Sequence, residues 1–382
     1  MKKLFAIFGA AALLAACTSS QEPALTASGL NPDDFTGTYN GASTALYTLS
    51  NDAGMEVCIT NFGGRIVSIV IPDKDGVGRD VVLGFDKVSD YFPENNASDF
   101  GAAIGRYANR INQGRITLDG ETYQLPQNNY GHCLHGGPTG WQYQVYEVLE
   151  ADKEHLKLQI VSPDGDNGFP GTVTACVTYT LDEDNNLRID YEAVTDKTTV
   201  INMTNHSYFN LSGDPANHSI CEDVLVLNCD RFTPVDDTYM TTGEIVPVEG
   251  TPFDFRTPKQ IGQDIDADCE QIRNGNGYDH NWVGNGPATE GGLYVIATLS
   301  CPATGISLCV QTDEPGVQVY SGNFLDGSVT GKKGIVYGQR SGICLETQHY
   351  PDTPNKPEWP SAVLRPGETY TSTCVFTFTT ER

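Results

Sequence analysis

Apolar and polar side chains alternate with a period of two along most of the chain. Clear examples are residues 55–71, 143–161, 172–191, 293–299 and 374–378. Successive side chains of a β-strand point to opposite faces, so this period predicts strands with a buried face. No stretch carries the sustained apolar stripe of an amphipathic helix. The chain is therefore predicted to be all-β.

Turn residues support the same architecture. Asp119-Gly120 lies between two alternating segments, and a glycine supplies the positive φ of a tight two-residue hairpin turn. Forty glycines and 21 prolines provide for many further turns. We expect a large antiparallel β-sandwich with few short helices, among them helical turns at residues 88–92 and 258–262.

The first residues have the pattern of an export signal. Lys2 and Lys3 precede a short apolar run, residues 4–16, which ends in Leu-Ala-Ala before Cys17. The run is too short to cross a bilayer, and a cysteine after Leu-Ala-Ala resembles the bacterial lipoprotein signal. Residues 1–16 are then removed and Cys17 carries lipid. The alternative is an ordinary signal peptide with an incidental cysteine.

This signal predicts the organisation of the rest of the chain. Residues 17–38, rich in Ser, Thr, Pro and Asp, are expected to form a flexible tether, and residues 39–382 one domain. The expected location is that of an exported, membrane-anchored lipoprotein, in the periplasm or at the outer membrane of a Gram-negative bacterium.

Charge and cysteine content narrow the possible partners and compartments. The formal net charge is −26, which repels phosphate backbones, so nucleic acid is not an expected partner and a neutral substrate fits better. Ten cysteines remain after Cys17, without the spacing of a disulfide framework. Free thiols and disulfides are the two alternatives for these cysteines. We expect free buried thiols, because a core this large does not need crosslinks.

Two short segments combine glycine with planar polar groups. Asn109-Arg110 is flanked by apolar residues, which suggests a turn that points a guanidinium inward as a donor to hydroxyls or an oxyanion. Near His132, Cys133 and His135, adjacent glycines would let the backbone approach a ligand. A zinc site there lacks a second ligand pair at a recognisable spacing, so His135 is expected to donate to a substrate oxygen instead.

Two further segments each hold one proton-transferring group. His206 lies among aromatic residues and titrates near neutral pH, although such a histidine can also serve only a buried hydrogen bond. Glu346 is a single carboxylate in an apolar strand, which is costly unless the group is paired with an arginine or used in catalysis. Asp279 and Gln318 complete the candidate set.

Taken together, these segments resemble the aldose 1-epimerase family, also called galactose mutarotases, from about Tyr39 to the end of the chain. The resemblance rests on GRYANRI (105–111), LHGG (134–137), TNHSYFNL (204–211), YDHN (278–281), PGVQVYSGNFLDG (315–327) and CLETQ (344–348). It implies a galactose mutarotase-like supersandwich with an open cleft, needing no metal and no other cofactor. It also implies an aldose sugar as substrate, and we expect a monomer.

The resemblance assigns a role to each candidate. Glu346 is the base that removes the proton from the anomeric hydroxyl, and His206 is the acid that protonates the ring oxygen. Substrate contacts are expected from Asn109, Arg110, His135, Asp279 and Gln318. Two other functions stay open: a non-catalytic carbohydrate-binding lipoprotein, and an epimerase for phosphorylated hexoses, which would need a cationic pocket.

Overall fold

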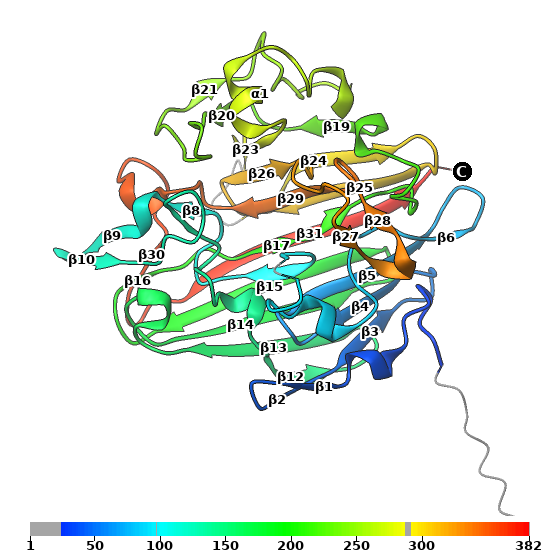
Figure 1. Cartoon of the computed structure of the whole chain (residues 1–382), viewed down its shortest axis with the longest axis horizontal. Helices are drawn as coiled ribbons and strands as arrows, with labels where there is room; N and C mark the ends of the chain where they lie inside the picture. The colour runs from blue at the N-terminus through cyan, green and yellow to red at the C-terminus, as the bar shows by residue number, and fades with distance from the viewer. Residues whose placement is uncertain (1–23, 97, 287–291, 382) are drawn as a thin grey trace, which may run out of the picture.

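Two large antiparallel sheets packed face to face form the body of the molecule (Figure 1). The computed structural model describes residues 24–96, 98–286 and 292–381. Every pair of strands within its sheets is antiparallel, which confirms the predicted all-β sandwich. No helix among these residues is long and apolar enough to cross a membrane.

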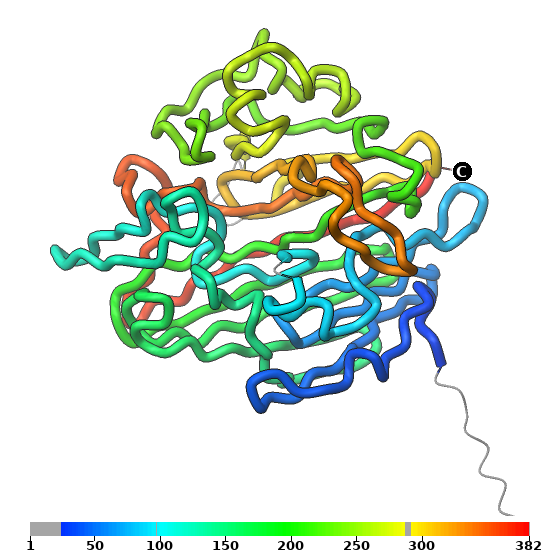
Figure 2. The backbone as a smooth tube through the Cα atoms, in the orientation of Figure 1, coloured from blue at the N-terminus to red at the C-terminus, as the bar shows by residue number. Residues whose placement is uncertain are grey.

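The larger sheet has nine strands, and most of them bury one face only. In spatial order they are β12 (Glu147–Ala151), β13 (His155–Ser162), β14 (Val173–Leu181), β15 (Asn186–Thr195), β31 (Tyr370–Thr380), β25 (Ile306–Thr312), β24 (Tyr294–Cys301), β19 (Val224–Leu227) and β22 (Lys259–Gln260). Buried and partly exposed positions alternate along β14 and β25, as the sequence period predicts. The C-terminal strand β31 lies in the middle of this sheet (Figure 2).

The second sheet has six strands, and its central strands are buried on both faces. Its order is β18 (Tyr208–Phe209), β29 (Ile343–Gln348), β26 (Gly316–Tyr320), β23 (Asp279–Val283), β20 (Arg231–Thr233) and β21 (Val246–Pro247). Every residue of β23, β26 and β29 is buried. One face of these strands packs into the core, and polar side chains occupy the other face.

Smaller sheets and turns complete the sandwich. A four-stranded sheet holds β3 (Leu46–Ser50), β4 (Glu56–Thr60), β5 (Arg65–Pro72) and β6 (Gly78–Asp80). The two-stranded pairs are β1 (Gly37–Tyr39) with β2 (Ala42–Thr44), β7 (Ala102–Ile104) with β17 (Thr204–His206), β8 (Arg110–Ile111) with β11 (Cys133–Leu134), β9 (Arg115–Leu118) with β10 (Glu121–Gln124), β16 (Thr199–Val200) with β30 (Val363–Leu364), and β27 (Val329–Thr330) with β28 (Val336–Tyr337).

Across residues 24–96, 98–286 and 292–381, helical structure is limited to short segments of at most six residues. The α-helix is α1 (Glu270–Gly275), and the 3₁₀ turns are η1 (Pro32–Phe35), η2 (Val88–Tyr91), η3 (Asn112–Gly114), η4 (Trp141–Tyr143), η5 (Asp166–Gly168), η6 (Ile220–Glu222), η7 (Ile261–Gln263), η8 (Lys332–Gly334) and η9 (Thr353–Asn355). The turn expected at 88–92 is confirmed. The one expected at 258–262 is wrong at its start, because residues 259–260 form β22 and the helical turn begins at Ile261.

The hairpin predicted at Asp119-Gly120 is present. It joins β9 to β10, and both turn residues have positive φ, 50° and 86°. The alternating stretches 55–71, 143–161 and 172–191 each overlap two strands, namely β4 and β5, β12 and β13, and β14 and β15. In the first of them the two strands are separated by a turn that contains Gly63 and Gly64. Apolar alternation continues across that turn, so the period alone did not reveal it.

The ordered body begins earlier than the expected tether allows. Within the expected 17–38 segment, η1 and the start of β1 are ordered. Leu30 and Phe35 are buried in an apolar cluster, and the Thr44 hydroxyl donates to the Phe35 carbonyl at 2.9 Å. Residues 24–38 therefore belong to the domain. Cys17 and the expected leader lie outside the described residues.

The ten cysteines between Cys58 and Cys374 are all free thiols. Six of them are buried and four are half-buried, which agrees with the expectation of unpaired thiols in a large core. The apolar contact between the sheets is continuous without crosslinks. Phe209 of the smaller sheet, for example, packs on Phe376 of the larger one with ring centroids 5.1 Å apart.

Candidate active site

One cavity gathers all seven residues that the sequence assigned to the sugar site. It encloses about 350 Å³. Its lining consists of Asp99, Asn109, Arg110, Asn129, Tyr130, Leu134, His135, His206, Tyr208, Asp279, Gln318, Tyr320, Phe324 and Glu346. These residues come from segments up to almost 250 positions apart, so the fold, and not local sequence, assembles the site.

Three adjacent strands supply one wall of the cavity. On β29, Glu346 shares a face with Cys344, whereas Leu345 points to the core between the sheets. Gln318 of β26 lies directly opposite Glu346 in the strand register. Asp279 of β23 accepts a hydrogen bond from Gln318 Nε2 at 2.7 Å. Strand register therefore sets these three polar groups side by side.

His206 reaches the same cavity from β17, which pairs with β7. Its Nε2 lies 3.5 Å from Glu346 Oε1, and its Nδ1 lies 3.5 Å from the Cys344 sulfur. Both side chains are almost fully buried, at 6% and 2% exposure. The imidazole and the carboxylate are thus close enough to act on two oxygens of one small molecule.

Burial shifts the pKa values of this pair in opposite directions. It raises the pKa of Glu346 well above its usual value, and the nearby charges of Asp279 and Asp99 add to the rise while Arg110 opposes it. Burial also lowers the pKa of His206, with Asp99 opposing the change. Both shifts arise because burial disfavours the charged form of each group, and they act against the ordinary difference between the pKa values of a carboxyl and an imidazole.

His135 presents a hydrogen-bond donor to the cavity. The backbone N–H of Asn109 donates to His135 Nδ1 at 3.1 Å, so the proton of the neutral ring lies on Nε2. Burial lowers the pKa of His135 to about 3, which keeps the ring neutral around pH 7. Its ring centroid is 5.2 Å from that of His206, in an edge-to-face arrangement.

Arg110 is held by Asn129 and an aromatic ring. Its Nε and Nη2 donate to Asn129 Oδ1 at 3.2 and 3.0 Å, and its guanidinium lies 5.2 Å from the centre of the Tyr239 ring. Asn109 has a φ of 61°, and its side-chain oxygen accepts the Arg110 backbone N–H at 2.8 Å.

Several polar atoms of the cavity have no hydrogen-bond partner in the part of the chain that the structure describes. They are Glu346 Oε2, Gln318 Oε1 and Asp99 Oδ1, each shielded from solvent. An unpaired buried polar atom costs about 1–3 kcal/mol, and that cost is recovered when a ligand supplies the missing hydrogen bond. The cavity is therefore built for a ligand with several hydroxyl groups.

The sequence did not predict Asp99 as a site residue. Its carboxylate and the ring nitrogens of His135 and His206 lie within 4.8 Å of one another. Asp99 belongs to no strand, so no period marked it. Aromatic residues of the cavity rim were also missed, namely Tyr130 and Phe324, which are both exposed although they are large and partly apolar. A pair of exposed aromatic residues near site segments was the available signal.

The zinc alternative at His132, Cys133 and His135 is not supported. His132 Nδ1 accepts the Gln113 backbone N–H at 3.0 Å, and its Nε2 is 2.9 Å from the Thr238 hydroxyl. His135 uses Nδ1 for Asn109. In the part of the chain that the structure describes, these three residues do not form a common ligand cluster.

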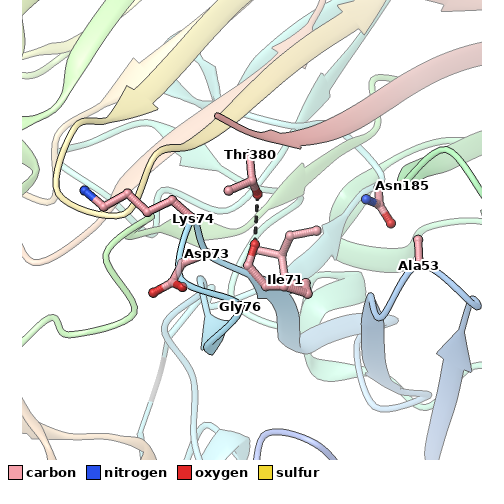
Figure 3. A pocket seen from close by; sticks show the side chains of 8 residues that line it. Ala53, Ile71, Asp73, Lys74, Gly76, Asn185 and Thr380 are labelled. Atoms are coloured by element: carbon pink, nitrogen blue, oxygen red, sulfur yellow. Dashed lines mark hydrogen bonds between the residues drawn. The ribbon is translucent and has the colours of Figure 1, made fainter. Parts of the chain in front are cut away.

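A second pocket lies at the outer end of the larger sheet (Figure 3) and contains none of the predicted residues. Two of its polar side chains are engaged in local structure. Asp73 accepts the Val77 backbone N–H and the Arg79 Nε–H, and the Thr380 hydroxyl donates to the Pro72 carbonyl at 2.8 Å.

Gly136 holds two site loops together, and its replacement is expected to destabilise the protein. Its φ is 77°, and a Cβ there would clash with the Gly105 carbonyl oxygen. Gly136→Ala should cost about 1–2 kcal/mol for the left-handed backbone and about 1–3 kcal/mol more for the clash, with reduced activity. Gly120→Ala is the matched control, because its φ is 86° and its surroundings are open. Equal loss of stability in chemical denaturation of both variants would contradict this account.

The fold and the cavity define a β-sandwich protein that binds a polyhydroxyl ligand beside a proton-transferring pair. Comparison with known proteins makes this assignment specific. The family model for aldose 1-epimerase matches residues 45–377. The chain belongs to the aldose 1-epimerase family, and it is an isomerase of the mutarotase type.

Individual relatives and solved structures agree with this placement. The chain is 41% identical to galactose mutarotase of Mus musculus over 340 residues, covering 88% of this chain and 95% of the relative. It is 39% identical to aldose 1-epimerase of Escherichia coli K12 over 348 residues, covering 90% and 97%. A crystal structure of an aldose epimerase homologue from C. elegans superposes with a TM-score of 0.80 at 31% identity, covering 89% and 100%.

Proposed function

We propose that the chain interconverts the α and β anomers of free hexoses such as glucose and galactose. Glu346 removes the proton from the hydroxyl on C1 while His206 donates a proton to the ring oxygen. The bond between C1 and the ring oxygen breaks, and an open-chain aldehyde forms. Rotation about the C1–C2 bond presents the other face of the aldehyde. The reverse proton transfers then close the opposite anomer and restore both side chains.

One observation carries this proposal: His206 Nε2 and Glu346 Oε1 lie 3.5 Å apart in a single cavity of about 350 Å³. This volume is at the lower end of the range of about 300–1,000 Å³ for small-molecule pockets, which suits one monosaccharide. A reversible ring opening needs an acid and a base with similar proton affinities, and burial moves the pKa of Glu346 up and that of His206 down, against their ordinary difference.

The remaining polar residues of the cavity hold the sugar hydroxyls. His135 donates from Nε2, Asp279 and Gln318 offer acceptor oxygens, and Arg110 donates to an oxygen that gains negative charge. Asn109 acts through the turn that orients Arg110 and His135. In this arrangement the ring is fixed between the acid and the base before any bond changes.

Polarimetry tests the proposal directly. Purified protein should accelerate the change in optical rotation of freshly dissolved α-D-glucose or α-D-galactose well above the rate in buffer. A folded sample that binds sugar without accelerating this change would instead support a carbohydrate-binding protein. Activity only on phosphorylated hexoses would favour the third function, although Arg110 is the one Lys or Arg side chain among the described residues of the lining.

Asp99 is proposed to tune the acid. Its carboxylate raises the pKa of His206 against the effect of burial. Asp99→Asn should therefore lower the pKa of His206, so that the imidazole loses its proton at a lower pH. The alkaline limb of the profile of kcat/KM against pH should move to lower pH. The variant should lose less of its kcat/KM at acidic pH than at alkaline pH. Asp86→Asn, a carboxylate outside the cavity, is the control, and an unchanged profile for Asp99→Asn would remove this role.

We also propose that Cys17 is lipidated and anchors the protein to a membrane, facing the periplasm. The support is the order of Lys2 and Lys3, the apolar run and Leu-Ala-Ala before the cysteine. Mass spectrometry of protein extracted from membranes should find an acylated N-terminal Cys17. A chain that starts at another residue, or an unmodified cysteine, would contradict the anchor without affecting the enzyme.

A further inference from the structure

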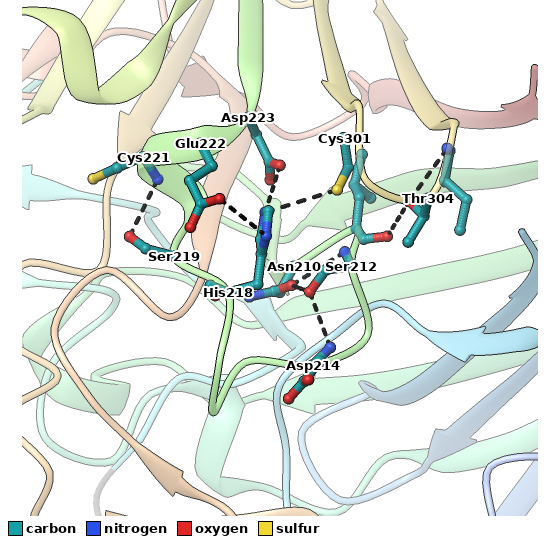
Figure 4. A network of polar contacts seen from close by, with 12 residues as sticks. Asn210, Ser212, Asp214, His218, Ser219, Cys221, Glu222, Asp223, Cys301 and Thr304 are labelled. Atoms are coloured by element: carbon teal, nitrogen blue, oxygen red, sulfur yellow. Dashed lines mark hydrogen bonds and ion pairs between the residues drawn. The ribbon is translucent and has the colours of Figure 1, made fainter.

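A second cluster of metal-binding side-chain types lies apart from the sugar cavity (Figure 4). His218 lies in the segment between β18 and η6, Asp223 directly follows η6, and Cys301 ends β24. Their ligand atoms all lie within 4.8 Å of one another. None of the three lines the sugar cavity, and the proposed mechanism uses none of them.

The side chains converge on one nitrogen of the imidazole. His218 Nε2 lies 2.8 Å from Asp223 Oδ1 and 3.7 Å from the Cys301 sulfur. In a tetrahedral zinc site, ordinary bond lengths separate a nitrogen and a sulfur ligand by about 3.6 Å, and a nitrogen and an oxygen ligand by about 3.4 Å. The nitrogen–sulfur distance already fits, and the nitrogen–oxygen distance must open by about 0.6 Å when a metal replaces the proton.

A buried oxygen without a partner points to a missing ligand. Asp223 is fully buried, its Oδ1 lies 2.8 Å from His218 Nε2, and the Cys301 thiol lies beside the same carboxylate. Among the described residues its Oδ2 has no hydrogen-bond partner. Cys301 is also buried, at 1% exposure. A simple buried ion pair would leave this second carboxylate oxygen unsatisfied, which costs free energy. A cation held by the carboxylate would remove the cost.

The other nitrogen of His218 faces a second carboxylate. Nδ1 lies 3.8 Å from Glu222 Oε2. Metal-binding histidines commonly direct the nitrogen that is not on the metal toward a carboxylate, which fixes the orientation of the ring. His218 and Glu222 also line a surface cavity of about 360 Å³, so an ion can approach from solvent. The cluster thus has donors, an orienting partner and an entry path.

We infer that His218, Asp223 and Cys301 bind one zinc-like divalent cation through nitrogen, oxygen and thiolate sulfur. This mixed donor set suits Zn²⁺ or Co²⁺ and not the oxygen-preferring Mg²⁺ or Ca²⁺. Binding displaces the thiol proton of Cys301 and the proton shared by His218 and Asp223, and both are released to solvent. The cation joins the segment after β18 to the end of β24 and stabilises the fold without taking part in sugar chemistry.

Cobalt titration of the reduced full-length protein tests this site, because a thiolate bound to Co²⁺ gives a charge-transfer band in the near ultraviolet. We expect one Co²⁺ per chain with this band, displacement by Zn²⁺, and a higher melting temperature with either metal. Cys301→Ser should abolish the band, and Glu222→Gln should weaken binding about 10- to 100-fold. Mutarotation by Cys301→Ser should stay at the level of the unmodified protein.

Two control variants locate the signal. Cys309→Ser changes a half-buried thiol on the neighbouring strand, and Cys344→Ser changes the thiol that lies with His206 and Glu346 in a second possible cluster. Both should keep the cobalt band. No band in the unmodified protein, a band that survives Cys301→Ser, or a band lost in Cys344→Ser would overturn the proposal. If Cys301→Ser fails to fold, zinc X-ray absorption of the unmodified protein decides, since it must show one sulfur near about 2.3 Å.

Discussion

Glu346→Gln is expected to reduce mutarotation by about 10²- to 10⁴-fold while the protein still binds galactose. The amide keeps the shape of the side chain but cannot accept the proton of the anomeric hydroxyl. Glu346 occupies a strand buried on both faces, and the amide removes a carboxylate that burial already disfavours, so the fold should tolerate the change. Polarimetry gives the rate, and calorimetry gives the affinity for sugar.

Glu192→Gln is the matched control for this variant. It makes the same substitution in strand β15, at an exposed position away from the cavity, and should leave the rate unchanged. If Glu346→Gln retains the rate of the unmodified protein, the base must be another residue, and Asp279 would be the next candidate because it is the other carboxylate on the same wall of the cavity. A loss of both rate and sugar binding would mean that Glu346 mainly holds the substrate.

His206→Gln is the second variant with a large expected effect, again about 10²- to 10⁴-fold. Glutamine can donate a hydrogen bond to the ring oxygen, but it cannot transfer a proton to it. His155→Gln, in strand β13, is the control and should be neutral. The double variant Glu346→Gln/His206→Gln should be about as slow as the slower single variant, since a pair that acts as a unit shows non-additive losses. Fully additive losses would contradict concerted use of the pair.

The pH dependence of the reaction follows from the same pair. Activity requires one proton on the two groups together, with Glu346 ionised and His206 protonated when the ring opens. Burial raises the pKa of Glu346 and lowers that of His206, so rates should fall at both low and high pH and pass through a maximum between them. A rate that rises steadily across the whole range would exclude this acid–base pair.

Strand periodicity accounts for the direction of the polar side chains on the strand wall of the cavity. A single carboxylate in an otherwise apolar strand could only be satisfied by a partner or a ligand, and β29 places Glu346 opposite Gln318 and away from the core. The alternation of core and cavity residues in β23 and β26 follows the same rule, but it was the resemblance to the aldose 1-epimerase family that singled out Asp279 and Gln318 in the sequence.

Features outside regular strands were harder to predict. Asp99 reaches the site from an irregular segment before β7, where no period relates side-chain direction to sequence position. Residues 24–38 have the polar composition of a tether, but Leu30 and Phe35 pack in an apolar cluster, and Ser28 and Phe35 form hydrogen bonds with the body of the domain. The helix α1 has only six residues, too few for a helical period to appear.

The cluster of His218, Asp223 and Cys301 was likewise not predictable from the sequence. Its residues are separated by up to 83 positions and come from a turn and a strand end, so no sequence spacing suggested a ligand set. Cys133, the cysteine of the zinc alternative that the sequence did not favour, is part of an apolar cluster. The cluster that we infer to bind a metal therefore lies elsewhere in the fold than residues 132–135, where histidine and cysteine are closest in the sequence.

A crystal structure of Glu346→Gln with galactose tests the central claim most directly, namely that an imidazole and a carboxylate from distant segments act on the same pyranose. The account predicts the anomeric hydroxyl within hydrogen-bond distance of the residue-346 side chain, about 2.6–3.2 Å, and the ring oxygen equally close to His206 Nε2. A sugar bound with C1 and the ring oxygen directed away from these two side chains, or bound outside this cavity, would contradict it.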